Sequence, residues 1–176
     1  MFRNWSASRL VVTGVLTAVV AVLTLLVRVP VAPTRGYIHL GDVGVYFAAF
    51  AFGPAIGFLA GGLGTGLADV LGGYAHWAPL SFLFHGLQGL VAGYLALRGA
   101  RSGLFLGWLL GAIIMIGGYF LAGTVLYGAG PAVTELPANL AQALAGGVIG
   151  VPLAAAVRSA WPPVERLANP VGWRER

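Results

Sequence analysis

Long apolar stretches, separated by short breaks of glycine, proline and polar residues, run along most of the chain. The first covers residues 10–27, carries no charge and is bounded by Arg9 and Arg28. A helix needs about 20 apolar residues to cross a bilayer, so this stretch predicts a spanning helix. A cleaved signal peptide is the less favoured interpretation, because no A-x-A site follows the stretch.

The breaks divide the rest of the chain into five further helices. Residues 29–39 hold two prolines and a glycine, which predicts an ordered loop. The pair Gly53-Pro54 should end a short helix of about 14 residues and begin the next, since proline fits the first turn of a helix and disfavours helical geometry in the residue before it. The expected helices are residues 10–27, 41–53, 54 to about 69, 79–97, 103–126 and 135–157.

These patterns predict one all-α integral membrane domain, a bundle of six transmembrane helices over residues 1–158. Residues 159–176 would form a cytoplasmic tail. Gly57 and Gly61 repeat the four-residue spacing that begins at Gly53, and this strip of glycines should let another helix backbone approach closely.

Composition supports a membrane protein and removes several activities. Hydrophobic residues make up 59% of the chain, charged residues 9%, and the mean hydropathy is +0.88, which excludes a soluble globule. All ten basic residues are arginine, so a lysine P-loop and lysine Schiff-base chemistry are excluded. There is no cysteine, hence no thiol nucleophile or thiolate metal site. The sparse arginines form no stripe for nucleic acid.

The arginines instead predict orientation, because cytoplasmic loops are enriched in positive charge. With both termini in the cytoplasm, only Arg28 and Arg35 lie outside. We therefore expect a multi-pass protein of a prokaryotic plasma membrane, with a cytoplasmic face that carries Arg3, Arg9, Arg98, Arg101, Arg158, Arg166, Arg174 and Arg176.

Polar residues inside the membrane are costly and indicate a functional site. Glu135, Asn139 and Gln142 share one face of the last helix, at i, i+4 and i+7. With aromatic and polar residues from other segments, they should line an outer pocket for a small, planar, polar ligand. The candidate substrate-binding residues are Tyr37, His39, Asp69, Trp77, His85, Tyr119, Glu135, Asn139 and Gln142.

Structural roles are the alternative for each of these residues. Amides often only link helices, and Asp42 and Asp69 could cap helix ends or pair with Arg28 or Arg35. Catalysis is less favoured: the mid-chain serine, Ser81, lacks a G-x-S-x-G setting, and no two histidines have ligand spacing, so we expect no metal and no cofactor.

Two segments carry a resemblance to a known family. GYIHLGDVGVYFAAFAFGPAIGFLAGGLGTGLADVLGGYAHWAP begins at Gly36, and ELPANLAQALAGGVIGVPL begins at Glu135. Both resemble the substrate-binding S component of an energy-coupling-factor (ECF) vitamin transporter. The resemblance covers about residues 10–157 and is closest to the branch that handles pyridoxine, hydroxymethylpyrimidine or riboflavin-like compounds.

The resemblance implies a subunit without enzymatic activity that captures a ring-containing vitamin or precursor from outside. Pyridoxine or hydroxymethylpyrimidine is favoured, with riboflavin or thiamine as larger alternatives. Its implied partners are a transmembrane coupling (T) protein and two ATPase subunits, besides membrane lipid. Gly14 and Ala18, with Thr17 and Ala21 one position out of phase, would contact the T protein. A small intramembrane enzyme or a membrane scaffold is the alternative.

Overall fold

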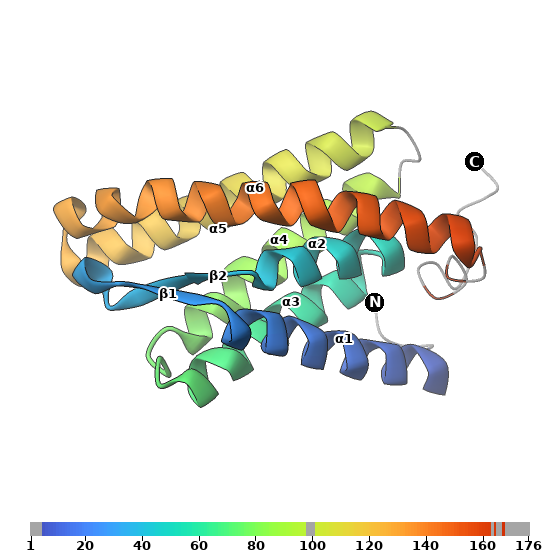
Figure 1. Cartoon of the computed structure of the whole chain (residues 1–176), viewed down its shortest axis with the longest axis horizontal. Helices are drawn as coiled ribbons and strands as arrows, with labels where there is room; N and C mark the ends of the chain where they lie inside the picture. The colour runs from blue at the N-terminus through green and yellow to red at the C-terminus, as the bar shows by residue number, and fades with distance from the viewer. Residues whose placement is uncertain (1–4, 98–100, 163, 165–166, 168–176) are drawn as a thin grey trace.

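Six α-helices and one small hairpin make up the described part of this computed structural model, residues 5–97, 101–162, 164 and 167 (Figure 1). The predicted all-α membrane bundle is thereby confirmed. Arg98 and most of the predicted tail fall outside the described residues. The elements are α1 (Ala7–Leu26), β1 (Arg28–Val31), the 3-10 turn η1 (Ala32–Thr34), β2 (Gly36–His39), α2 (Gly41–Phe52), α3 (Pro54–Gly72), α4 (Ala78–Ala96), α5 (Arg101–Tyr127) and α6 (Ala129–Ala160).

The short helix α2 lies at the centre of the bundle. It packs against α1, α3, α4 and α6, and every residue in it except Phe47 is buried. Its 12 residues extend about 18 Å, less than the hydrocarbon thickness of a bilayer. Its end is where the Gly53-Pro54 pair predicted it, because Gly53 has a φ of 87° and Pro54 opens α3. Helix α2 therefore serves as the core of the bundle.

Four helices are long and apolar enough by themselves to cross a membrane within the described residues: α1, α3, α5 and α6. Helix α4 has 19 residues but is less apolar. Its Ser81, His85 and Gln88 are all buried, so the polar face of α4 points into the protein. This orientation keeps the polar groups of α4 away from lipid.

Glycines bring α3 and α4 into backbone contact, as the four-residue spacing predicts. A Cβ atom on Gly61 would lie 2.6 Å from the carbonyl oxygen of His85, and one on Gly57 would lie 2.8 Å from that of Gly89. No side chain fits at these distances. The contact fixes the depth of α4 relative to α3 and thereby the height of its inward-facing polar groups.

The loop predicted at residues 29–39 is an antiparallel hairpin, in which Arg28 pairs with His39 and Val31 with Gly36. The sequence had predicted order there but not strands. In Figure 1 the hairpin lies at the left end of the bundle, with the α3–α4 and α5–α6 connections, whereas α1 begins and α6 ends at the opposite end. The predicted outer and cytoplasmic residues are thus separated along the bundle.

Helix α6 begins earlier than predicted. The expected loop before Glu135 is wrong, because the helix starts at Ala129, directly after Gly128 with its φ of 93°. Pro131 lies in the first turn, where its missing N–H costs nothing. Glu135 consequently lies in the second turn of α6 and faces the interior.

Helix α1 presents one face to the surroundings. Gly14 and Ala18 are exposed, Thr17 is half-buried and Ala21 is buried. A Cβ on Gly14 would meet nothing within 4 Å. Gly14 and Ala18 are therefore available for contact with a partner, whereas Thr17 and Ala21 are turned towards the bundle.

The α3–α4 contact should not tolerate a methyl group. We expect Gly89→Ala to lower the free energy of unfolding by about 1–3 kcal/mol, because its Cβ would overlap the backbone of Gly57. Gly117→Ala is the matched control, since a Cβ there meets nothing within 4 Å. Thermal unfolding in detergent measures both variants, and equal unfolding temperatures would contradict the assigned contact.

Candidate functional site

A small cavity lies where the hairpin meets the ends of α3, α4, α5 and α6. Its volume is about 20 Å³, which is enough for a water molecule and too small for a ring. The lining side chains are aromatic, carboxylate, amide, hydroxyl and imidazole groups. They belong to Tyr37, His39, Asp69, Trp77, Ser81, Tyr119, Glu135, Asn139 and Gln142, and the backbone of Gly36 completes the lining.

Aromatic rings form one wall of this cavity. The ring of Trp77, which directly precedes α4, is buried and lies 5.5 Å from the ring of Tyr119 on α5 and 6.0 Å from that of Tyr127. Tyr119 also shares a hydrogen bond with Ser81. These flat apolar surfaces suit a planar ligand, which can stack on them without freezing many rotatable bonds.

Two buried carboxylates line the cavity, Glu135 from α6 and Asp69 from α3. Glu135 Oε1 accepts a hydrogen bond of 2.8 Å from the Thr34 hydroxyl, and Asp69 Oδ1 accepts one of 2.6 Å from the Tyr37 hydroxyl. The second oxygen of each carboxylate has no partner among the described residues. An unpaired buried carboxylate oxygen is costly, so both oxygens are suited to receive N–H or O–H groups of a ligand.

The hairpin supplies donors to this site. Burial and then the hydrogen bond to Asp69 raise the pKa of Tyr37 above its ordinary value, so its hydroxyl keeps its proton. Burial, followed by the nearby His85, lowers the pKa of His39 well below its ordinary value, so its ring is neutral. The Gly41 N–H donates to His39 Nδ1 over 3.0 Å, which places the ring proton on Nε2.

Trp77 contributes a further donor to the cavity. Its indole Nε1 is buried and has no hydrogen-bond partner among the described residues. The cavity therefore combines free carboxylate acceptors with free N–H donors. A ligand that carries both donors and acceptors around a flat ring would complement it.

Eight of the nine predicted binding residues line this cavity. The exception is His85, which is fully buried one layer deeper, with its Nδ1 2.8 Å from Gln88 Oε1 and 3.3 Å from Asp42 Oδ1. Ser81 and Gly36 line the cavity without having been predicted as binding residues. Ser81 shares the spacing of the polar face of α4, whereas nothing in the sequence marks Gly36.

The alternative role considered for Asp42, an ion pair with Arg28 or Arg35, is wrong. Asp42 is buried and its carboxylate accepts hydrogen bonds from Gln88 and Gln142. Arg28 instead donates to the carbonyl oxygen of Gly72. The carboxylate of Asp42 is enclosed by side chains of α4 and α6, and its one ion-pair partner among the described residues is His85.

A membrane-embedded helical bundle with a polar pocket at one end is an architecture suited to binding a small solute. Residues 4–159 match the family described as "ECF-type riboflavin transporter, S component", and the chain belongs to this family. It is accordingly a membrane protein that serves as the substrate-binding subunit of a vitamin transporter and not an enzyme.

Two relatives extend the comparison. The chain is 32% identical over 176 residues to the thiamine precursor transporter HmpT of Lactococcus lactis subsp. cremoris (strain MG1363), covering 99% of this chain and 98% of the relative. It is 40% identical over 132 residues to the "Uncharacterized protein in gap 3'region" of Pyrococcus woesei, covering 74% of this chain and 88% of that protein.

Gly36 offers a test of how the hairpin is seated. A Cβ on Gly36 would lie 2.8 Å from Glu135 Oε1 and 3.3 Å from the Thr34 hydroxyl, so Gly36→Ala should break the Thr34–Glu135 hydrogen bond. Loss of this hydrogen bond removes about 1 kcal/mol of stability from the closed hairpin, so the fraction of molecules with an open hairpin should rise about fivefold. Limited trypsin digestion after Arg28, where the cleavage sequence is unchanged, measures this opening.

Gly130→Ala is the control for this digestion, because its Cβ meets nothing within 4 Å in the first turn of α6. Cleavage after Arg28 should proceed at the wild-type rate in the control. Equal rates in both variants would show that Gly36 does not seat the hairpin.

Proposed function

We propose that this S component captures a single-ring vitamin or vitamin precursor from outside the cell, with hydroxymethylpyrimidine or pyridoxine as the favoured ligand. The observation that carries the proposal is the pair of unpartnered carboxylate oxygens, Glu135 Oε2 and Asp69 Oδ2, beside the unpartnered indole N–H of Trp77. Riboflavin and thiamine are the larger alternatives.

The chemistry of a small aminopyrimidine or pyridine matches these groups. Its amino or hydroxyl hydrogens would bond to the free oxygens of Glu135 and Asp69, and a ring nitrogen would accept from Trp77 or His39. The ring would stack against the Trp77–Tyr119 wall. Support for a thiamine precursor comes from the full-length similarity to HmpT, whereas the family description supports riboflavin.

Cavity size favours the smaller ligands. The cavity of about 20 Å³ must enlarge for any ring to enter. Three hydrogen bonds hold the hairpin on the cavity: Thr34 to Glu135, Tyr37 to Asp69, and the backbone N–H of His39 to Gln142. A single ring requires less displacement of these contacts than a three-ring isoalloxazine. The hairpin would open to admit the ligand and close over it.

Delivery would follow from reorientation of the whole bundle on a coupling module made of a T protein and two ATPase subunits. The exposed Gly14 and Ala18 of α1 are the proposed contact with the T protein, because small residues permit close helix approach within a membrane. The distribution of arginines supports an orientation with both termini in the cytoplasm and the hairpin outside.

Ligand binding by purified protein tests the proposal. Isothermal titration calorimetry with hydroxymethylpyrimidine, pyridoxine, thiamine and riboflavin should give the highest affinity for one of the two single-ring compounds. Glu135→Gln should weaken that binding by about 10- to 100-fold, because a hydrogen bond to a charged group contributes about 1.5–3 kcal/mol. Asn139→Ala should weaken it less.

Leu140→Ala is the matched control on the same helix, since Leu140 is 51% exposed on the outer surface of α6. Its affinity should equal that of the wild type. Binding of riboflavin alone, or unchanged affinity in Glu135→Gln, would contradict the proposed ligand and its site.

A further inference from the structure

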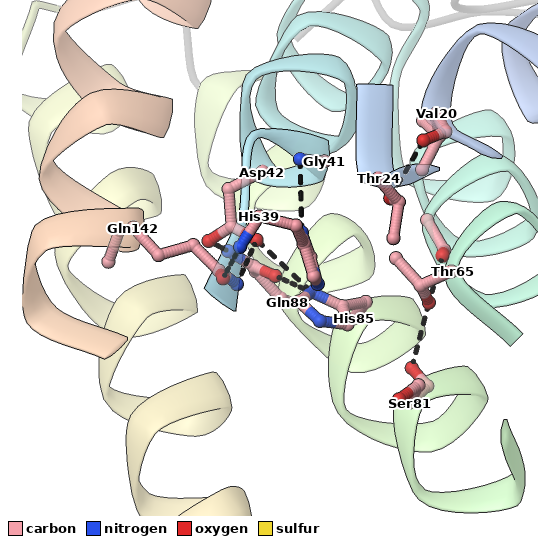
Figure 2. Close-up of polar contacts among 12 residues, drawn as sticks. Val20, Thr24, His39, Gly41, Asp42, Thr65, Ser81, His85, Gln88 and Gln142 are labelled. Atoms are coloured by element: carbon pink, nitrogen blue, oxygen red, sulfur yellow. Dashed lines mark hydrogen bonds and ion pairs between the residues drawn. The ribbon is translucent and has the colours of Figure 1, made fainter. Parts of the chain in front are cut away.

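One layer below the cavity, α2, α4 and α6 contribute a second group of polar side chains, the Asp42 cluster, which consists of Asp42, His85, Gln88 and Gln142 (Figure 2). Asp42 has an exposed fraction of 0% and does not line the cavity. Gln142 is the member of the cluster that also lines it. Any influence of Asp42 on a ligand must therefore pass through another residue.

The carboxylate of Asp42 dictates how two side-chain amides are turned. Its Oδ1 accepts from Gln142 Nε2 over 3.0 Å and its Oδ2 accepts from Gln88 Nε2 over 2.9 Å. Both amides present their NH2 groups to the two carboxylate oxygens, which accept these hydrogen bonds. The oxygens of both amides consequently point away from Asp42.

The outward oxygen of Gln142 meets the hairpin. Gln142 Oε1 accepts from the backbone N–H of His39, the last residue of β2, over 2.8 Å. If the Gln142 amide were reversed, its NH2 group would face the His39 N–H, and two donors would oppose each other. The hairpin would then lose one of the three hydrogen bonds that hold it on the cavity.

We propose that Asp42 is a positioning residue that keeps the hairpin closed by fixing the orientation of the Gln142 amide. The relay runs from the buried carboxylate through Gln142 to the backbone of His39. This inference rests on the proposed function, because closure of the hairpin matters for a ligand held beneath it. Asp42 would prolong the residence time of the ligand by keeping the hairpin closed, without touching the ligand itself.

Replacements at position 42 should have graded effects. Asp42→Leu offers no acceptor, so the NH2 group of Gln142 loses its partner and only the His39 N–H still orients the amide. Asp42→Asn keeps one neutral acceptor and adds a donor, so one of the two amides must turn, and a neutral acceptor is weaker than a carboxylate. The conservative variant should therefore retain part of the effect that Asp42→Leu abolishes.

Amide hydrogen exchange at His39 measures the relay directly and needs no ligand. The chain has three histidines, so ¹⁵N-histidine labelling gives three backbone NMR signals. That of His76, which lies outside the Asp42 cluster, serves as the internal reference. We expect the His39 amide to exchange about tenfold faster in Asp42→Leu and about two- to fivefold faster in Asp42→Asn.

Thr65→Val is the matched control, because Thr65 is a buried polar residue on α3 whose hydroxyl bonds to Gly61 and Ser81 and not to the hairpin. In Thr65→Val the His39 amide should exchange at the wild-type rate. Wild-type exchange in Asp42→Leu, or equal acceleration in all three variants, would overturn the proposal. If Asp42→Leu does not fold, Asp42→Asn decides, and unchanged exchange at His39 would overturn it.

Dissociation of hydroxymethylpyrimidine or pyridoxine, whichever binds the wild type, provides the functional readout. In Asp42→Asn the dissociation rate should rise by about two- to fivefold with little change in the association rate, as most affinity changes in related complexes reside in dissociation. An unchanged dissociation rate would show that Asp42 does not prolong the time that the ligand stays bound. Failure of the wild type to bind either ring would contradict the proposed function alone, because the exchange experiment is independent of ligand.

Discussion

Hydrocarbon around a membrane bundle offers no hydrogen bonds, so each polar side chain in its middle must find a partner inside the protein. In this chain the constraint places the polar faces of α4 and α6 against the central helix α2, where Asp42 receives both side-chain amides. Glu135 Oε2 and Asp69 Oδ2 have no hydrogen-bond partner among the described residues. A polar molecule that enters the cavity could supply one.

The hairpin unites these two consequences. It covers the cavity at one end of the bundle, and its residues bond to both cavity carboxylates as well as to Gln142. Groups that would bind a ligand are therefore also the groups that hold the lid. In the proposed mechanism, admission of a ligand and movement of the hairpin would be coupled through these hydrogen bonds.

Much of this arrangement was predictable because local rules govern it. The Gly53-Pro54 break, the glycine contact of α3 and the shared face of Glu135, Asn139 and Gln142 follow from backbone geometry and helical spacing. Resemblance to ECF transporter S components was confirmed by the family match over residues 4–159.

The remaining features depend on tertiary contacts that spacing does not encode. The hairpin strands have four residues each and β1 contains Pro30, so no alternating pattern marks them. The position of Gly36 beside Glu135 depends on segments far apart in the sequence. His85 shares the face of α4 with Ser81, but their depths differ, so one lines the cavity and the other bonds to Asp42 and Gln88. The early start of α6 reflects the tolerance of a first helical turn for Pro131.

The central claim is that the buried polar groups at the outer end of the bundle form one pocket for a single-ring vitamin precursor. Mass spectrometry of the small molecule that co-purifies with the protein from cells grown in rich medium tests it most directly. The account predicts one single-ring compound at about one molecule per chain, as expected for a tight site. Recovery of riboflavin, or of no small molecule in protein that remains folded, would contradict it.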